Sequence, residues 1–401
     1  MIIGVVGKPS VGKSTFFKAS TLADVEIASY PFTTIKPNEG VGFVRVTDSA
    51  TFFEKHSNPR EGYVMDDFRF VPVRLIDVAG LVPGAHAGEG MGNQFLDDLR
   101  QADVLIHVID ASGSTNEKGE AVDAGSYNPS NDVKFLEVEL DMWYVGILKK
   151  GWDKFARTIQ QEKQNVVKAL AKQLSAMKVT EAMVEDSCKK SSMNLEAPSE
   201  WTDTNLTDLA TQLRRLTKPM VIAANKVDTP SGKENIKKLK EEFPQLLIIP
   251  CSGESELALR EAAKHELIRY IPGAKTFEVT EKGAGALNDK QKAALEFMKK
   301  NILDSFDHGT GVQQVLNTAV FELLQYIEIY PGGDKLEDKN GNTLPDCFLM
   351  PKNTTALDFA FRLHTDFGKN FVRAKDIKTK MVVGREHQLR RGDVIEIMSS
   401  K

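Results

Sequence analysis

The sequence contains few cysteines and no long apolar stretch. Only three of the 401 residues are cysteine, and their wide spacing matches neither a disulfide framework nor a metal-binding motif. No apolar run reaches the roughly eighteen residues that a membrane-spanning helix needs, and the first apolar run is too short for the core of a signal peptide. We therefore expect a cytoplasmic protein that does not contact membranes.

A strong excess of either charge is also missing. The chain has 52 lysines and arginines against 56 aspartates and glutamates, which gives a net charge of −4. A total charge this small neither indicates nor excludes nucleic acid as a partner. The hydrophobic fraction of 41% is ordinary for a globular protein, and the length suits two or three domains.

A phosphate-binding loop lies close to the start of the chain. Residues 7–14 read G-K-P-S-V-G-K-S, directly after an apolar run over residues 2–6 and before a helical segment. In this strand–loop–helix context the glycines let several backbone N–H groups converge on one anion, and the helix N-terminus adds partial positive charge. Lys13 is predicted to contact the β- and γ-phosphates, and Ser14 to bind Mg²⁺. The residues predicted to hold the nucleoside triphosphate are Gly7, Lys8, Pro9, Ser10, Val11, Gly12, Lys13, Ser14 and Thr15.

Two segments have the composition of nucleotide-dependent switches. Prolines at both ends of residues 30–38 predict a mobile loop, in which Thr34, or else Thr33, supplies the second ligand for Mg²⁺. An apolar strand ending at Asp77 begins the second switch. Asp77 is predicted to hold Mg²⁺ through a water molecule, and the Gly80 amide to contact the γ-phosphate.

The residue after Gly80 is Leu81, at a position where many GTPases carry the glutamine that orients the attacking water. Leucine cannot do this, so we expect slow turnover unless a partner helps. Four glycines then crowd residues 84–92, which also include His86. His86 is a candidate for positioning the water; the alternative is a switch-loop side chain with no catalytic role.

Apolar residues spaced by three and four recur between residues 132 and 216, with charged residues between them. This spacing is close to a heptad and predicts an antiparallel, coiled-coil-like helical insert. The pattern is helical again from 256 to about 325. Residues 346–397 instead show short strands, turns and one helix, which predict a compact half-barrel about the size of ubiquitin.

Between the insert and the C-terminal helices, an apolar run over residues 220–224 ends in N-K-V-D. Guanine has two hydrogen-bond donors on one edge, and the single carboxylate of Asp228 can accept both. Asn225 is predicted to brace the loop, and the stem of Lys226 to lie over the purine plane. A second strand leads to backbone amides predicted to meet the guanine oxygen. The base-contacting residues are therefore predicted to be Asn225, Lys226, Asp228, Ser252 and Gly253.

Positive charge is concentrated between residues 351 and 391. This segment holds ten lysines and arginines and four acidic residues, a surplus of six in a chain of −4, so the remainder carries −10. The basic residues are Lys352, Arg362, Lys369, Arg373, Lys375, Lys378, Lys380, Arg385, Arg390 and Arg391. Such a patch suggests a phosphate backbone as partner; the alternative is an ordinary solvated surface.

Taken together, these motifs resemble the YchF subfamily of Obg-related P-loop GTPases. The resemblance is carried by residues 7–14, 30–38 and 77–86 and by the helical insert, while residues 125–129 and 135–137 are similar to the archaeal branch. Residues 355–358, 364–368 and 389–395 resemble a TGS domain. The resemblance implies a G domain with a coiled-coil insert, a C-terminal TGS domain and an association with ribosomes or translation.

Two residues depart from the family pattern. Bacterial and eukaryotic members carry a base motif that ends in glutamate and prefer ATP, whereas this motif ends in Asp228. Relatives that use K⁺ often have asparagine where this loop has Ser10, so K⁺ dependence is left open.

The predicted fold is α/β: a P-loop NTPase G domain with a doubly wound, mostly parallel sheet, a helical insert and a β-grasp-like TGS domain. The predicted domains are 1–131 with 217–325, 132–216 and 326–401. The predicted function is slow, Mg²⁺-dependent hydrolysis of GTP to GDP and phosphate as a switch, with Lys13, Thr34, Gly80 and His86 as catalytic candidates. The expected partner is the ribosome or rRNA, through the TGS domain and the insert. An ATP-preferring hydrolase and a ribosome-binding scaffold with negligible turnover are the alternatives.

Overall fold

The computed structural model describes residues 1–21, 38–78 and 92–400. The chain forms two compact units, one made of Met1–Phe17 and Leu75–Glu254, the other of Lys18–Arg74 and Ser255–Lys401. Within the described ranges, no helix is long and apolar enough to cross a membrane. The division into domains at residues 131, 216 and 325 stays a prediction.

Four parallel strands form the core of the first unit. They lie side by side in the order β1 (Ile2–Val6), β5 (Val104–Asp110), β6 (Met220–Asn225) and β7 (Leu247–Pro250). Every residue of β5 and β6 is buried, as expected for parallel strands covered on both faces. The mostly parallel sheet confirms the predicted α/β class.

Helices follow these strands and bring the chain back for the next one. They include α1 (Lys13–Thr21), α2 (Gly92–Gln101) and α8 (Pro230–Glu242). The last residues of strand β4 (Phe68–Asp77) also belong to this unit, where the Val78 N–H donates to the Val5 carbonyl oxygen at 3.0 Å. Because parallel strands end at the same edge of a sheet, the loops after β1, β5 and β6 meet there.

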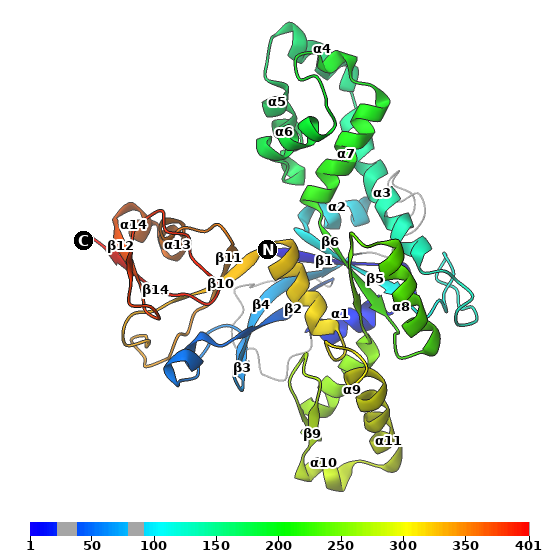
Figure 1. Ribbon diagram of the computed structural model, residues 1–401, viewed down its shortest axis with the longest axis vertical. Helices are drawn as coiled ribbons and strands as arrows, with labels where there is room; N and C mark the ends of the chain where they lie inside the picture. Colours follow the sequence, from blue (N-terminus) through cyan, green and yellow to red (C-terminus); the bar gives the residue numbers. More distant parts are fainter. Residues whose placement is uncertain (22–37, 79–91, 401) are drawn as a thin grey trace. The chain divides into compact units, whose positions relative to one another are not determined.

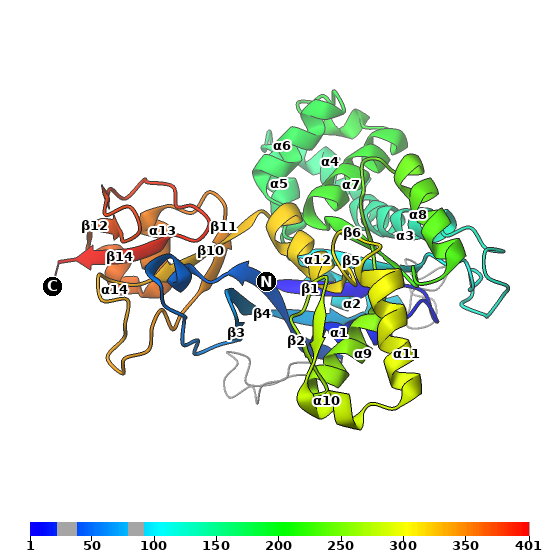
Figure 2. The ribbon, with the colours of Figure 1, turned by 60° about the horizontal axis from the view of Figure 1, so that its bottom comes forward.

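The insert between β5 and β6 is a small helical bundle (Figures 1 and 2). Its two longest helices, α3 (Ser130–Lys149) and α7 (Asp203–Thr217), pack against each other. Between them lie α4 (Trp152–Gln161), α5 (Val166–Gln173) and α6 (Glu181–Lys190). The side chains of Asn165, Thr180 and Thr202 cap the starts of α5, α6 and α7, so the near-heptad pattern is divided among several helices.

The second unit contains the C-terminal sheet. Its order is β11 (Phe348–Pro351), β10 (Tyr326–Pro331), β14 (Val394–Ser399), β12 (Phe371–Asp376) and β13 (Val382–Val383). Helix α13 (Ala356–Leu363) packs on one face through Phe359, in a core with Ile329 and Ile395. A second short helix, α14 (Thr365–Lys369), was not expected from the sequence.

The remaining strands and helices of the second unit include one correction. Within the helical pattern expected from 256 to about 325, the first helix was expected to continue to Tyr270, but its last residues form β8 (Ile268–Tyr270), which pairs with β9 (Phe277–Val279) in an antiparallel hairpin. Ile268 and Tyr270 are buried while Arg269 between them is exposed, an alternation too short to distinguish from a helix by sequence. The other elements are β2 (Glu39–Thr47), β3 (Tyr63–Met65), α9 (Gly253–Lys264), which begins in the first unit, α10 (Glu281–Ala286), α11 (Asp289–Met298) and α12 (Val312–Asn317).

One buried histidine lies in the central sheet. His107 in β5 is 1% exposed, and its Nδ1 atom has no hydrogen-bond partner among the described residues. Burial, with a smaller contribution from the positive charge of Lys8, lowers the pKa of His107 to about 3. His107 is therefore neutral in the native protein at any pH near neutrality.

This burial predicts a pH dependence of stability. An unfolded histidine titrates near pH 6.5, so below that pH the unfolded state binds a proton that the native state does not. The free energy of unfolding should fall by about 1.4 kcal/mol per pH unit, or roughly 2 kcal/mol between pH 6.5 and pH 5. Urea unfolding of the His107→Leu variant should lack this contribution, whereas His265→Leu, at an exposed site, should keep it. If the free energy of unfolding had the same pH dependence in the unmodified protein and in both variants, His107 would not be the source of this effect.

Candidate functional site

The loop between β1 and α1 has a backbone that requires glycine at two positions. Gly12 has φ of +88°, and a Cβ atom there would lie 2.3 Å from Asn225 Nδ2. A Cβ atom on Gly7 would lie 2.5 Å from the Val108 carbonyl oxygen. Both glycines therefore let the loop pack closely on the ends of β5 and β6.

The charged end of Lys13 lies at the end of β4. Its ammonium group forms an ion pair with Asp77 and donates a hydrogen bond to the Val78 carbonyl oxygen at 2.9 Å. Ser14 is exposed in the first turn of α1. Lys13 and Asp77, two residues predicted for phosphate and metal, thus lie in direct contact.

Asn225, at the end of β6, connects two loops. Its Nδ2 group donates to the Val11 carbonyl oxygen at 2.9 Å, and its Oδ1 atom accepts from the Gly253 N–H at 2.9 Å. Asn225 therefore braces the phosphate-binding loop against the loop after β7. The Gly253 amide, predicted to meet the guanine oxygen, is used by Asn225 instead.

A cavity of about 230 Å³ joins the phosphate-binding loop to the N-K-V-D loop. Gly12 and Thr15 line one side, and Asp228 lines another, where its Oδ1 atom accepts from the Ser252 hydroxyl at 3.3 Å. The full lining is Gly12, Thr15, Ser112, Ser114, Ala124, Asn225, Lys226, Asp228, Thr229, Ser252 and Glu254. The structure thus gathers at one cavity residues that are more than two hundred positions apart in the sequence.

Some of the residues that line this cavity were not predicted from the sequence. The segment after β5 was interpreted only as a loop, yet Ser112 and Ser114 line the cavity. Asp110 accepts hydrogen bonds from both serines and from Lys226 Nζ at 3.0 Å. Burial alone would raise the pKa of Asp110, but these hydrogen bonds hold it below its ordinary value. The sequence did contain a signal for this part of the site: Asp110, like Asp77, lies at the end of an apolar strand, where ligands bind in a parallel sheet.

A buried ion pair holds this segment beside the phosphate-binding loop. Lys8 Nζ lies 2.8 Å from Asp132, donates to the Thr115 carbonyl oxygen at 3.0 Å and lies 4.0 Å from the centre of the Tyr127 ring. Lys8 and Asp132 are both buried, and burial raises the pKa of Asp132 against the opposing effect of Lys8. Lys8, predicted to contact the nucleotide, therefore has its charge neutralised inside the protein.

Several predicted residues lie outside the described part of the chain. These are Thr33, Thr34, Gly80, Leu81 and His86, so both switches and the water-positioning candidate stay predictions.

The basic C-terminal segment is less positive than the count over residues 351–391 suggests. Arg391 pairs with Glu328 at 3.0 Å, and Lys375 pairs with Asp334 at 2.6 Å. Both acidic partners precede the counted window. Residues 326–401 contain 13 basic and 11 acidic residues, a difference of only +2. Any affinity for phosphate must therefore depend on particular side chains and not on overall charge.

Three family descriptions match the chain. Residues 2–136 match the family described as "50S ribosome-binding GTPase", and residues 223–334 match "Obg-like GTPase YGR210-like, G4 motif-containing domain". Residues 329–399 match the TGS domain. Fold and site together define a P-loop GTPase domain followed by a TGS domain.

Relatives and solved structures identify the family. "Uncharacterized GTP-binding protein MJ1332" of Methanocaldococcus jannaschii is 46% identical, with 100% of this chain and 99% of that protein covered. "Ribosome-binding ATPase YchF" of Bacillus subtilis is 32% identical over 66% of this chain and 69% of its own length. The crystal structure of a GTP-binding protein from Pyrococcus horikoshii matches all of both chains, with a TM-score of 0.80 and 39% identity. This chain belongs to the YchF subfamily of Obg-related P-loop GTPases.

The bracing role of Asn225 leads to a prediction. Asn225→Ala leaves the Val11 carbonyl oxygen and the Gly253 N–H without their buried partner, at a cost of about 1–3 kcal/mol each. We expect a lower free energy of unfolding and at least tenfold weaker binding of a fluorescent guanine nucleotide. The exposed residue Asn340 provides the control, because Asn340→Ala should change neither quantity. Unchanged nucleotide affinity in Asn225→Ala would contradict the bracing role.

Proposed function

We propose that this protein binds GTP in preference to ATP and hydrolyses it slowly to GDP and phosphate, as a nucleotide-dependent switch that acts on the ribosome. The observation that carries this proposal is the position of Asp228 on the wall of the cavity that begins at the phosphate-binding loop. A carboxylate there can accept both donors on the guanine edge. Adenine has no such pair of donors.

The phosphate side of the site has suitable chemistry. The N–H groups of the loop and the start of α1 favour an anion, and Lys13 supplies a positive charge beside them. For Lys13 to contact a phosphate, its ion pair with Asp77 must loosen. The hydroxyl of Ser14 and the carboxylate of Asp77 are oxygen ligands of the kind that Mg²⁺ prefers. When bound, Mg²⁺ would neutralise charge on the β- and γ-phosphates.

Slow turnover is supported by Leu81, which cannot orient a water molecule as glutamine does. The switch role rests on the segments containing Thr34 and Gly80, whose composition suits loops ordered by the γ-phosphate. His86 stays a candidate for positioning the water. The proposed ribosomal action is supported by the names of relatives, since the Bacillus subtilis protein is called a ribosome-binding ATPase.

Base preference is the first test of this proposal. Some relatives are named ATPases, among them "Obg-like ATPase 1" of Gallus gallus, which is 26% identical. A site built to hydrogen-bond a substrate rejects an analogue without the matching groups by large factors, and for this open site we expect at least about a hundredfold. Competition of GDP, GTP and ATP against one fluorescent nucleotide measures the ratio. Equal binding of ATP and GTP would favour the adenine-nucleotide alternative.

The Asp228→Asn variant tests the same carboxylate directly. It replaces an acceptor with a donor, so guanine affinity should fall and xanthine affinity should rise, because the C2 carbonyl of xanthine accepts that bond. Glu254, which also lines the cavity, is the matched control: Glu254→Gln should keep the preference for guanine. A variant that retains guanine preference would show that Asp228 does not contact the base.

Hydrolysis is tested through Lys13. Lys13→Ala removes the positive charge beside the phosphates and should reduce multiple-turnover phosphate release at least a hundredfold. Lys18→Ala, on the exposed side of the same helix, should leave the rate unchanged. The measurement is made with and without ribosomes, and we expect ribosomes to raise the rate of the unmodified protein. No release under either condition would favour the scaffold alternative.

A further inference from the structure

The chain that leads from β5 to α3, drawn in cyan in Figures 1 and 2, forms a short turn over residues 115–121. An antiparallel bridge joins the first and last residues of this turn. The side chain of Asn116 accepts from the backbone N–H groups of Lys118 and Glu120, both at 3.0 Å. The Asn116 carbonyl oxygen accepts from the Gly119 N–H at 2.9 Å. These bonds give the segment, which we call the 115–121 turn, a defined conformation.

The 115–121 turn lies directly on the phosphate-binding loop. Gly119 has φ of +81°, and a Cβ atom there would lie 2.7 Å from both the Cβ atom and the carbonyl oxygen of Pro9. At the base of the turn, the Thr115 carbonyl oxygen accepts from the buried ammonium group of Lys8 at 3.0 Å. Two neighbouring residues of the phosphate-binding loop thus contact the turn at its tip and at its base.

Lys118, the residue before Gly119, is the cation of this turn. It is exposed, and its ammonium group has neither an ion pair nor a hydrogen bond in the described part of the chain. Of its two acidic neighbours on the turn, Glu120 accepts from the side-chain amide of Asn116 at 2.8 Å, and Glu117 is exposed. The flexible four-carbon stem of a lysine lets its charge reach beyond the adjacent residue.

The other described lysines around the phosphate-binding loop already have partners. Lys8 is neutralised by Asp132 inside the protein. Lys226 Nζ forms an ion pair at 3.0 Å with the aspartate at the end of β5. Lys13 is assigned to the phosphates of the bound nucleotide. Among the described lysines of this region, Lys118 is therefore the one available for charge that develops only during the reaction.

Hydrolysis of GTP creates charge that a cation can stabilise. The water oxygen forms a bond to the γ-phosphorus, one water proton passes to a phosphate oxygen, and the bond to the β–γ bridging oxygen breaks with its electron pair left on GDP. In other GTPases a cationic side chain at this point, from the same chain or from a partner, raises the rate by about 10³–10⁵. Because Leu81 stands in place of the glutamine that orients water, such a cation would contribute through charge and not through the water.

We propose that Lys118 is a catalytic residue of this protein, whose ammonium group contacts the β–γ bridging oxygen and the γ-phosphate oxygens in the transition state. The contact of Gly119 with Pro9 carries this assignment, because it holds the residue next to Lys118 against the phosphate-binding loop. Lys118 keeps its proton throughout the step. This inference rests on the proposed hydrolysis of GTP.

Replacing Lys118 tests the rate of hydrolysis separately from binding. At saturating GTP, phosphate release by Lys118→Ala should be at least about tenfold slower, whereas Lys118→Arg keeps the charge and should stay within about threefold of the unmodified protein. The affinity for GDP should not change, because the contact forms only in the transition state. The control Glu117→Ala removes a neighbouring exposed charge from the same turn and should not be slower. Equal rates in Lys118→Ala and the unmodified protein would overturn the proposal.

A transition-state analogue provides a second measurement. GDP with aluminium fluoride imitates the transferring phosphoryl group, so it should bind to the unmodified protein at least about tenfold more tightly than GDP alone. Lys118→Ala should lose most of this gain while binding GDP alone as before. An equal gain in both proteins, or no gain in either, would overturn the role of Lys118.

Gly119 tests the position of the turn. Gly119→Ala places a Cβ atom against Pro9, so the turn must move, and phosphate release should slow about as much as in Lys118→Ala, with GDP affinity unchanged. Gly341→Ala is the matched control: φ is also +81° there, but no atom of the described residues lies within 4 Å of the added Cβ. If Gly119→Ala were as fast as Gly341→Ala, the contact with Pro9 would not position Lys118.

These measurements separate the role of Lys118 from the proposed function. If the unmodified protein hydrolyses GTP and Lys118→Ala does so equally fast, only the role of Lys118 fails. If the unmodified protein releases no phosphate, the proposed hydrolysis fails, and the aluminium fluoride titration then decides on Lys118. A gain in affinity that depends on Lys118 would support its position beside the phosphates, and a gain that does not would overturn it.

Discussion

The candidate site depends on the side-chain amide of Asn225. Its donor holds the Val11 carbonyl oxygen of the phosphate-binding loop, and its acceptor holds the Gly253 amide of the loop after β7. This close approach of the amide requires glycine at position 12, because a Cβ atom there would collide with Asn225 Nδ2. One buried amide thus sets the distance between the residues that would contact phosphate and those that would contact the base.

Buried charges connect the rest of the site to this brace. The pair of Lys8 and Asp132 joins the phosphate-binding loop to the start of the helical insert. Asp110 holds Lys226 in the same way from the end of β5. Removing one partner of such a pair leaves an uncompensated buried charge, so these pairs fix the arrangement of loops even where they add little net stability. The segment after β5 therefore forms part of the site although it has no regular structure.

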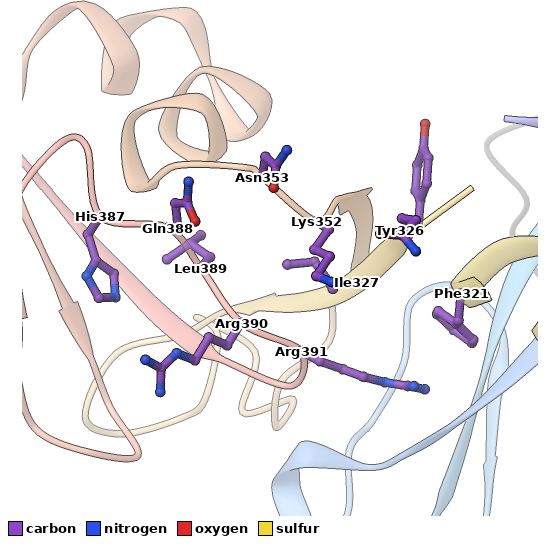
Figure 3. A pocket seen from close by; sticks show the side chains of 11 residues that line it. Phe321, Tyr326, Ile327, Lys352, Asn353, His387, Gln388, Leu389, Arg390 and Arg391 are labelled. Atoms are coloured by element: carbon purple, nitrogen blue, oxygen red, sulfur yellow. The ribbon is translucent and has the colours of Figure 1, made fainter. Parts of the chain in front are cut away.

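The basic residues between positions 351 and 391 differ in whether an acidic side chain neutralises them. Ten basic residues within 41 positions suggested a general affinity for phosphate backbones. The structure pairs Arg391 with Glu328 and Lys375 with Asp334, and it leaves Lys352 and Arg390 exposed, without an ion pair in the described ranges (Figure 3).

The sequence by itself determined the strands of the parallel sheet, the phosphate-binding loop and the motif ending at Asp228, because short apolar runs and the spacing of glycines are local patterns that extend over a few residues. It also identified the family. It did not predict the hairpin of β8 and β9, whose alternation is too short to read locally, nor that the helical insert is divided into five helices. Three features of the site became visible only in the tertiary structure. Ser112 and Ser114 line the cavity, Lys8 forms a buried ion pair with Asp132, and the Gly253 N–H donates to Asn225. Each of these results depends on contacts between residues far apart in the chain, which no local pattern encodes.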